Sequence, residues 1–171
     1  HKFVAMKDEL TEAWERLDRL HNNKGELRGV PTGFPEIDNK LAGLQKADLI
    51  ILAARPSVGK TSLALDIARQ AAINHQVPVG IFSLEMTSQQ LVDRMLAAQA
   101  NVDAWKLRTG KLTSETDFAA IRQSLDKLSQ APIYIDDQPG NTILKMRSVA
   151  RRLKSEKGLG LLVVDYLQLM V

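Results

Sequence analysis

The spacing of apolar residues separates an N-terminal helix from a longer mixed segment. Apolar side chains recur every three or four residues across residues 3–22, which places them on one stripe of a helix: Phe3, Met6, Leu10, Trp14, Leu17 and Leu20. Asn22, Asn23 and Gly25 are helix-ending signals, and residues 24–33 are predicted to be a linker. The apolar stripe packs either on its own domain or on a neighbouring subunit, and its periodicity leaves both open.

After Pro31, short apolar runs alternate with amphipathic helices, which is typical of an α/β fold with a mainly parallel sheet. Four runs are predicted to be strands: residues 49–54, 79–84, 132–135 and 161–164. Helices are expected at residues 60–74, 87–100, 114–128 and from 141 or 142 to about 157. Two of them begin with possible capping boxes, formed by Thr87 with Gln90 and by Ser114 with Asp117.

Composition narrows the class of protein only slightly. A chain of 171 residues with 44% hydrophobic residues suits one main globular domain. It has no cysteine, so disulfides and thiolate metal sites are excluded. The chain has no apolar run of roughly 20 residues, so we expect a cytoplasmic protein that does not enter the membrane. The net charge of +3 permits nucleic-acid binding without indicating it.

One loop carries the strongest chemical signal. The segment Ala54-Arg55-Pro56-Ser57-Val58-Gly59-Lys60-Thr61 fits the phosphate-loop pattern G-x-x-x-x-G-K-[ST] except at its first position. Ala54 departs from that pattern because alanine resists backbone angles that glycine accepts freely. The loop lies between a predicted strand and a predicted helix, so backbone N–H groups at the helix N-terminus can surround phosphate oxygens. A chance Gly-Lys-Thr at a helix start would not explain this context.

The residue types of this loop match separate tasks in binding ATP. Lys60 is expected to neutralise charge on the β- and γ-phosphates, Thr61 to bring a hydroxyl to Mg²⁺, and Gly59 to allow close approach of the backbone. The nucleotide-binding residues are predicted to be Arg55, Pro56, Ser57, Val58, Gly59, Lys60, Thr61 and Ser62.

Acidic residues follow three of the predicted strands. Asp165 comes directly after the fourth strand, so it is expected to face the phosphate loop and to hold Mg²⁺ directly or through water. Glu85 follows the second strand, where it could polarise the water that attacks the γ-phosphate, although the residues alone favour an ordinary first-turn acid. Asp136 and Asp137 are rival carboxylates after the third strand, and a turn is the favoured explanation for both.

The last predicted helix is strongly basic: Lys145, Arg147, Arg151, Arg152, Lys154 and Lys157 lie on it or just beyond it. A solvated outer face is the favoured interpretation. Contact with a nucleic-acid backbone is the weaker one, because no aromatic residues are interleaved to stack on bases.

Four segments, in this order, resemble the DnaB-type bacterial replicative DNA helicases: RGVPTGF (28–34), AARPSVGKT (53–61), FSLEM (82–86) and VVDYLQLM (163–170). The resemblance covers residues 28–171 and implies a RecA-like P-loop ATPase core. In this family Ala-Arg-Pro-Ser is a usual form of the loop, so Ala54 agrees with the narrower pattern. The resemblance also implies that Glu85 is the catalytic glutamate, that Lys60 shares in catalysis and that Asp165 holds the metal.

The same resemblance implies an assembly and partners. Helicases of this kind are ring hexamers with ATP sites between subunits, an arginine finger donated in trans and central loops that grip single-stranded DNA during 5′ to 3′ translocation. Residues 1–27 resemble the linker helix that docks on the adjacent subunit. Primase and a helicase loader are the further partners that the family implies.

The sequence departs from the family pattern at its end, since only six residues follow Asp165. A motor of this family continues through further strands, so we expect a fragment with slow hydrolysis, incomplete at its C-terminus. A RecA-like recombinase or repair ATPase is the second interpretation, and the sequence Ser83-Leu84-Glu85-Met86 argues against it. A third is a non-catalytic loader or scaffold that uses nucleotide only to fix its oligomeric state.

Overall fold

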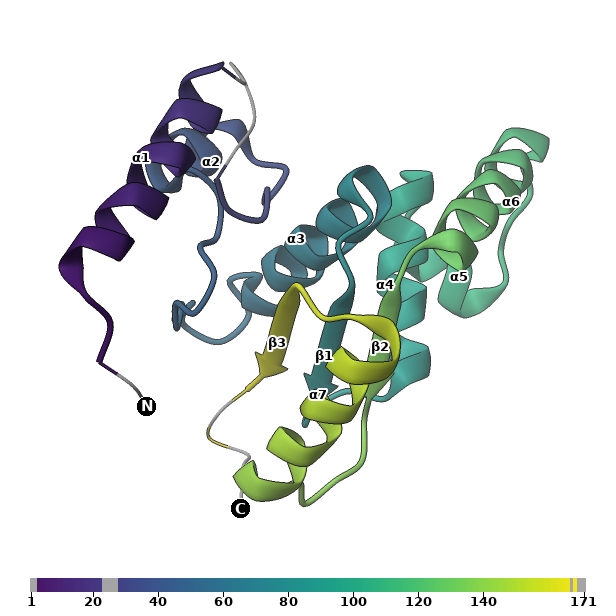
Figure 1. Ribbon diagram of the computed structural model, residues 1–171. Helices are drawn as coiled ribbons and strands as arrows, with labels where there is room; N and C mark the ends of the chain where they lie inside the picture. The colour runs from purple at the N-terminus through teal and green to yellow at the C-terminus, as the bar shows by residue number, and fades with distance from the viewer. Residues whose placement is uncertain (1–2, 23–27, 167, 169–171) are drawn as a thin grey trace.

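Three parallel strands form the centre of the protein in a computed structural model that describes residues 3–22, 28–166 and 168 (Figure 1). The strands are β1 (Val79–Ser83), β2 (Ile133–Asp136) and β3 (Leu161–Asp165), in the order β2-β1-β3. Both neighbours run parallel to β1. Three of the four predicted strands are therefore confirmed, each within about one residue of its expected bounds.

Helices cover both faces of this sheet. Helices α3 (Lys60–His75), α4 (Ser88–Ala100) and α6 (Glu115–Gln130) lie on one face with the short α5 (Ala104–Thr109), and α7 (Ile143–Lys157) lies on the other (Figure 1). The main core lies between the first group of helices and the sheet, and its buried members are Leu65, Ala68, Ala72, Val79, Ile81, Leu91 and Met95. The predicted α/β class is thereby confirmed.

Helix α7 packs closely on β1 because Gly80 has no side chain there. A Cβ atom added to Gly80 would lie 3.1 Å from Leu153 Cδ2 and 3.2 Å from Leu162 Cδ1, tighter than an ordinary van der Waals contact. The strand β1 is fully buried along its length, as expected for a central strand covered on both faces.

The predicted strand at residues 49–54 is wrong for the described part of the chain. These residues run into the phosphate loop without pairing to any strand, and Leu49, Ile51 and Leu52 are 86%, 71% and 42% exposed. A strand exists only where a neighbour satisfies its backbone N–H and C=O groups. Among the described residues β3 pairs with β1 alone, and residues 49–54 belong to no described strand.

The helix ends show which capping predictions were correct. The capping box of Thr87 with Gln90 is confirmed at the start of α4. Thr142, not Asn141, caps α7, and its side chain accepts a hydrogen bond from the backbone of Lys145. The box predicted for Ser114 is wrong: Ser114 begins α6 but its hydroxyl pairs with the hydroxyl of Thr116 instead of a backbone N–H.

Two short helices were not predicted from the sequence. One is α5, and the other is α2 (Pro35–Leu41), which follows the segment expected to be a linker. Residues 24–27 of that segment, together with the predicted helix-ending residue Asn23, lie outside the described residues. Hydrogen bonds of a buried carboxylate tie α2 to the residues before it. Asp38 accepts from the backbone N–H and the hydroxyl of Thr32, both at 2.8 Å, and from Gly33 N at 3.2 Å. Three donors compensate for burying that carboxylate.

The N-terminal helix α1 (Met6–Asn22) is confirmed as an amphipathic helix without buried residues. Acidic residues lie in its first turn and basic ones in its last, which suits the helix dipole. Met6, Leu10, Trp14 and Leu17 are each more than half exposed, so their stripe packs on no described part of this chain. None of the described helices is long and apolar enough to cross a membrane.

Candidate nucleotide-binding site

The loop before α3 has the backbone shape that surrounds phosphate. Residues 55–59 curve into Gly59, the residue before the first turn of α3, and Gly59 has a φ of 99°, in the left-handed region that favours glycine. Ser57 also has a positive φ, of 65°. Ala54 does not, so the missing first glycine costs this loop no strain. The residues from Arg55 to Gly59 are all exposed.

Lys60, Thr61 and Asp165 meet at the carboxyl edge of the sheet. The hydroxyl of Thr61 donates a hydrogen bond of 2.8 Å to one carboxylate oxygen of Asp165, and Lys60 Nζ lies 3.4 Å from the other. Lys60 also lies over the ring of Tyr166, 4.0 Å from its centroid. The structure thus brings together three residues that the sequence analysis had placed at the same edge.

Asp165 is held rigidly among these partners. It is 7% exposed and ends β3 opposite Ser83. Its backbone carbonyl accepts a hydrogen bond of 2.8 Å from Leu84 N, so the hydrogen bonding between β1 and β3 continues to Leu84, one residue past the end of β1. The hydroxyl of Thr61 and the carboxylate of Asp165 are oxygen ligands of the kind Mg²⁺ prefers. The side chain of Lys60 is 27% exposed, so solvent reaches it.

Glu85 lies in the turn between β1 and α4, two residues beyond Ser83. Its side chain is exposed, and within the described residues it makes no hydrogen bond or ion pair. The turn itself is closed by Ser83, whose hydroxyl donates to Met86 O at 2.7 Å and accepts from Met86 N at 3.2 Å. Glu85 is therefore free to meet a nucleotide, but no described contact joins it to Asp165.

The two rival carboxylates have different surroundings. Asp136 accepts from Gln138 N at 3.0 Å, which agrees with the predicted turn. Asp137 instead reaches α4 and accepts a 2.6 Å hydrogen bond from Ser88 N. That backbone N–H lowers the pKa of Asp137, so its carboxyl is ionised near neutral pH. Sequence reasoning missed this contact, and no local pattern could have found it because the two residues are 49 positions apart.

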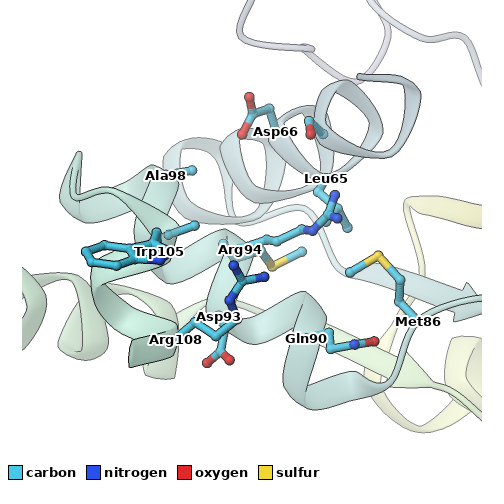
Figure 2. Close-up of a pocket in the computed structure, with 12 residues that line it drawn as sticks. Leu65, Asp66, Met86, Gln90, Asp93, Arg94, Ala98, Trp105 and Arg108 are labelled. Carbon is cyan, nitrogen blue, oxygen red and sulfur yellow. The ribbon is translucent and has the colours of Figure 1, made fainter. Parts of the chain in front are cut away.

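A separate cleft of about 480 Å³ lies behind the loop between α3, α4 and α5 (Figure 2). Figure 2 shows Arg94, Asp93 and Gln90 on α4, with Trp105 at one end and Met86 at the other. Of the predicted nucleotide-binding residues only Ser62 lines this cleft. The cleft is therefore a neighbour of the phosphate loop and not the nucleotide site itself.

The basic side chains of α7 are all exposed, in agreement with the expected solvated face. Arg152 lies 3.9 Å from Glu156, and Lys145 donates to Gln138 at 3.0 Å. Neither contact links α7 to the phosphate loop.

The fold and the phosphate loop together are those of a P-loop ATPase domain of the RecA-like kind, a class of domain that implies nucleotide binding. The chain belongs to the DnaB-like helicase C-terminal domain family, whose model matches residues 29–171. The helicase resemblance seen in the sequence is thereby confirmed, and the recombinase reading is set aside.

Curated relatives agree with this assignment. The chain is 51% identical over 168 residues to the replicative DNA helicase DnaB of Geobacillus stearothermophilus and 50% identical to the replicative DNA helicase DnaC of Bacillus subtilis. Each alignment covers 98% of this chain and 37% of the relative, so the chain spans little more than a third of either protein.

Solved structures of similar proteins share the fold. One solved ATPase domain superposes with a TM-score of 0.90 at 27% identity, covering 99% of this chain and 60% of that one. A DnaB-like replicative helicase, studied with its interactions with primase, superposes with a TM-score of 0.83 at 26% identity, covering 99% of this chain and 40% of the other. These matches confirm the predicted RecA-like fold.

Proposed function

We propose that this chain is the ATP-hydrolysing motor of a replicative DNA helicase, which couples hydrolysis to translocation on single-stranded DNA and to duplex unwinding. The observation that carries the proposal is the meeting of Lys60, Thr61 and Asp165 beside a phosphate loop of the correct backbone shape. Membership in the DnaB-like family supports the helicase role. Residues 28–171 form the motor domain in this proposal, and residues 1–27 form the linker.

The chain's own residues divide the work of binding. The residues from Arg55 to Ser62 contact the nucleotide, and the backbone N–H groups at the start of α3 face its phosphates. Lys60 exchanges its contact with Asp165 for the β- and γ-phosphates, and shares in catalysis by neutralising their charge. Mg²⁺, held by Thr61 and Asp165, supplies further charge neutralisation when bound.

Glu85 acts as the general base in this proposal. It accepts a proton from the water that attacks the γ-phosphate, and its carboxylate is available for that contact because it is exposed and has no partner among the described residues. The family resemblance selects it over Asp136 and Asp137, and the observed hydrogen bonds of those two side chains support the choice.

Stimulation by DNA tests the motor function directly. We expect the rate of ATP hydrolysis by the full-length protein to rise several-fold on adding single-stranded DNA, because a motor couples its chemical cycle to its track. Release of phosphate is measured with a single-stranded oligonucleotide and, as a control, with a matched blunt duplex. A rate of hydrolysis that neither DNA changes would contradict the motor function. It would favour a role in which nucleotide only fixes the oligomeric state.

The exposed stripe of α1 supports assembly into a ring hexamer. Met6, Leu10, Trp14 and Leu17 form an apolar surface that no described part of the same chain covers. A groove of about 280 Å³ between α4, α6 and β2 has a mainly apolar lining, with Val92 and Leu125 partly exposed. We place the α1 stripe of one subunit in this groove of the next, which is a helix-in-groove contact.

Substitution of Leu10 tests this docking. Leu10→Asp puts a charge at the centre of the stripe, where burial without a partner is costly, so we expect assemblies in Mg²⁺ and ATP to need at least about tenfold more protein. Sedimentation velocity measures the effect. Thr11→Asp adds the same charge on the polar face of α1 and should assemble normally. Equal assembly of both variants would rule out docking through this stripe.

Further partners follow from the family. We propose that primase and a helicase loader bind the complete protein, and that it acts at the bacterial replication fork in the cytoplasm. Support for primase comes from the similar helicase studied with its interactions with primase, and support for a bacterial setting from the curated relatives.

A further inference from the structure

We propose that Asp137 is a positioning residue for Glu85, holding the start of α4 so that the turn before it presents Glu85 toward the nucleotide. The inference rests on the proposed catalytic role of Glu85. It concerns a carboxylate on a different strand, which acts through the backbone of Ser88 and does not touch the nucleotide.

The direction of Glu85 depends on its neighbours along the chain. The side chain is exposed and has no described partner of its own, so the region that its carboxylate can reach depends on where the backbone of the turn lies. A displacement of about 1 Å in a catalytic group can lower a rate by about 10²-fold. Contacts that hold this turn therefore bear directly on the reaction.

The N-terminal side of the turn is held by β1 and β3. Leu84 N donates to the backbone carbonyl of Asp165 at 2.8 Å, which ties the residue before Glu85 to the residue proposed to hold the metal. Ser83 is 1% exposed, and its hydroxyl bonds both the N–H and the carbonyl of Met86, the residue after Glu85. Both neighbours of Glu85 are thus anchored.

The C-terminal side of the turn is held by Asp137. The capping box joins Thr87 to Gln90 but leaves the N–H of Ser88, the first residue of α4, without a partner in the helix. Asp137 Oδ2 takes that hydrogen bond at 2.6 Å. A negative charge at a helix N-terminus is also favoured by the helix dipole.

Through Asp137, a second strand besides β3 supports this turn. It follows β2 directly, and β2 and β3 flank β1 on opposite sides. Asp165 holds the turn from β3, and Asp137 holds it from β2. The backbone around Glu85 is thereby held by contacts from β3 on one side and from the residue after β2 on the other.

Removing this support should slow hydrolysis without weakening nucleotide binding. We expect Asp137→Ala to lower kcat by about 10- to 100-fold in the full-length protein, with KM for ATP changed less than about twofold. Asp137→Asn keeps an acceptor but loses the charge, so its kcat should lie between those of the wild type and the alanine variant. Asp93→Ala, an exposed acid later on α4, is the matched control and should behave as wild type.

A double-mutant cycle distinguishes positioning from general damage to the fold. Once Glu85→Gln has removed the base, Asp137→Ala should lower the residual rate no further, because Asp137 acts through Glu85. The asparagine variant provides the same cycle if the alanine variant does not fold. An equal loss in both backgrounds, or a loss confined to KM, would overturn the proposal. If Glu85→Gln leaves hydrolysis intact, the proposed catalytic role of Glu85 is wrong. If Glu85→Gln abolishes hydrolysis while both Asp137 variants keep wild-type kcat, only the positioning role of Asp137 is wrong.

Discussion

Glu85→Gln is expected to lower the rate of ATP hydrolysis by about 10²- to 10⁴-fold while leaving nucleotide affinity nearly unchanged. The substitution keeps the size of the side chain and removes its capacity to accept a proton. Because the Glu85 side chain is exposed and has no described hydrogen bond, neither the fold nor the phosphate loop should change. Single-turnover hydrolysis and equilibrium binding of a fluorescent ATP analogue, on the same samples, measure the two effects separately.

Glu115→Gln is the matched control for this prediction. Glu115 is an exposed glutamate at the start of α6, far along the chain from the phosphate loop, and its substitution should leave hydrolysis unchanged. The pair also separates a motor from a loader or scaffold. In a protein that uses nucleotide only to fix its oligomeric state, Glu85→Gln would not change the rate of hydrolysis. That result would contradict the catalytic role of Glu85.

Lys60→Ala is expected to weaken binding of the ATP analogue by at least about 100-fold and to remove measurable hydrolysis. Lys60 Nζ lies 3.4 Å from Asp165, beside the loop proposed to surround the phosphates, and a preorganised charge of this kind contributes about 10²- to 10³-fold to a rate. Among the predicted nucleotide-binding residues 55–62, Arg55 is the only other one that carries a charge. Fluorescence titration in the presence of Mg²⁺ measures the loss of affinity.

Lys46→Ala controls for the loss of a positive charge in general. Lys46 is exposed and lies before the phosphate loop, in a turn that takes no part in the site. Saturable binding by the Lys60 variant with wild-type affinity would show that the nucleotide occupies another part of the chain, such as the cleft in Figure 2.

The sequence predicted those parts of the site that local pattern encodes. Lys60 and Thr61 follow from a fixed spacing, and Asp165 follows from an apolar run that must end at the carboxyl edge of a parallel sheet. The structure places all three in contact. Glu85 could not be selected in this way, because the residues alone favoured an ordinary acid in the first turn of the following helix, and only the family resemblance selected it.

The parts that could not be predicted depend on partners distant in the chain. The hydrogen bond from Ser88 to Asp137 joins two turns whose proximity arises only when β1 and β2 pair. Residues 49–54 show the converse: their apolar run has the composition of a strand, but composition cannot supply the neighbour that a strand requires. In both places the missing information was tertiary.

The unpaired run at residues 49–54 also affects how the isolated chain should behave in a test tube. Leu49, Ile50, Ile51 and Leu52 are between 42% and 86% exposed, and β3 has one edge free among the described residues. An exposed apolar segment and an open sheet edge can each pair with strands from other molecules, and residues 49–54 contain no Lys or Pro to prevent this. Purified alone, the chain should precipitate at moderate concentration, and solubility screens would need to target this segment before any enzymology begins.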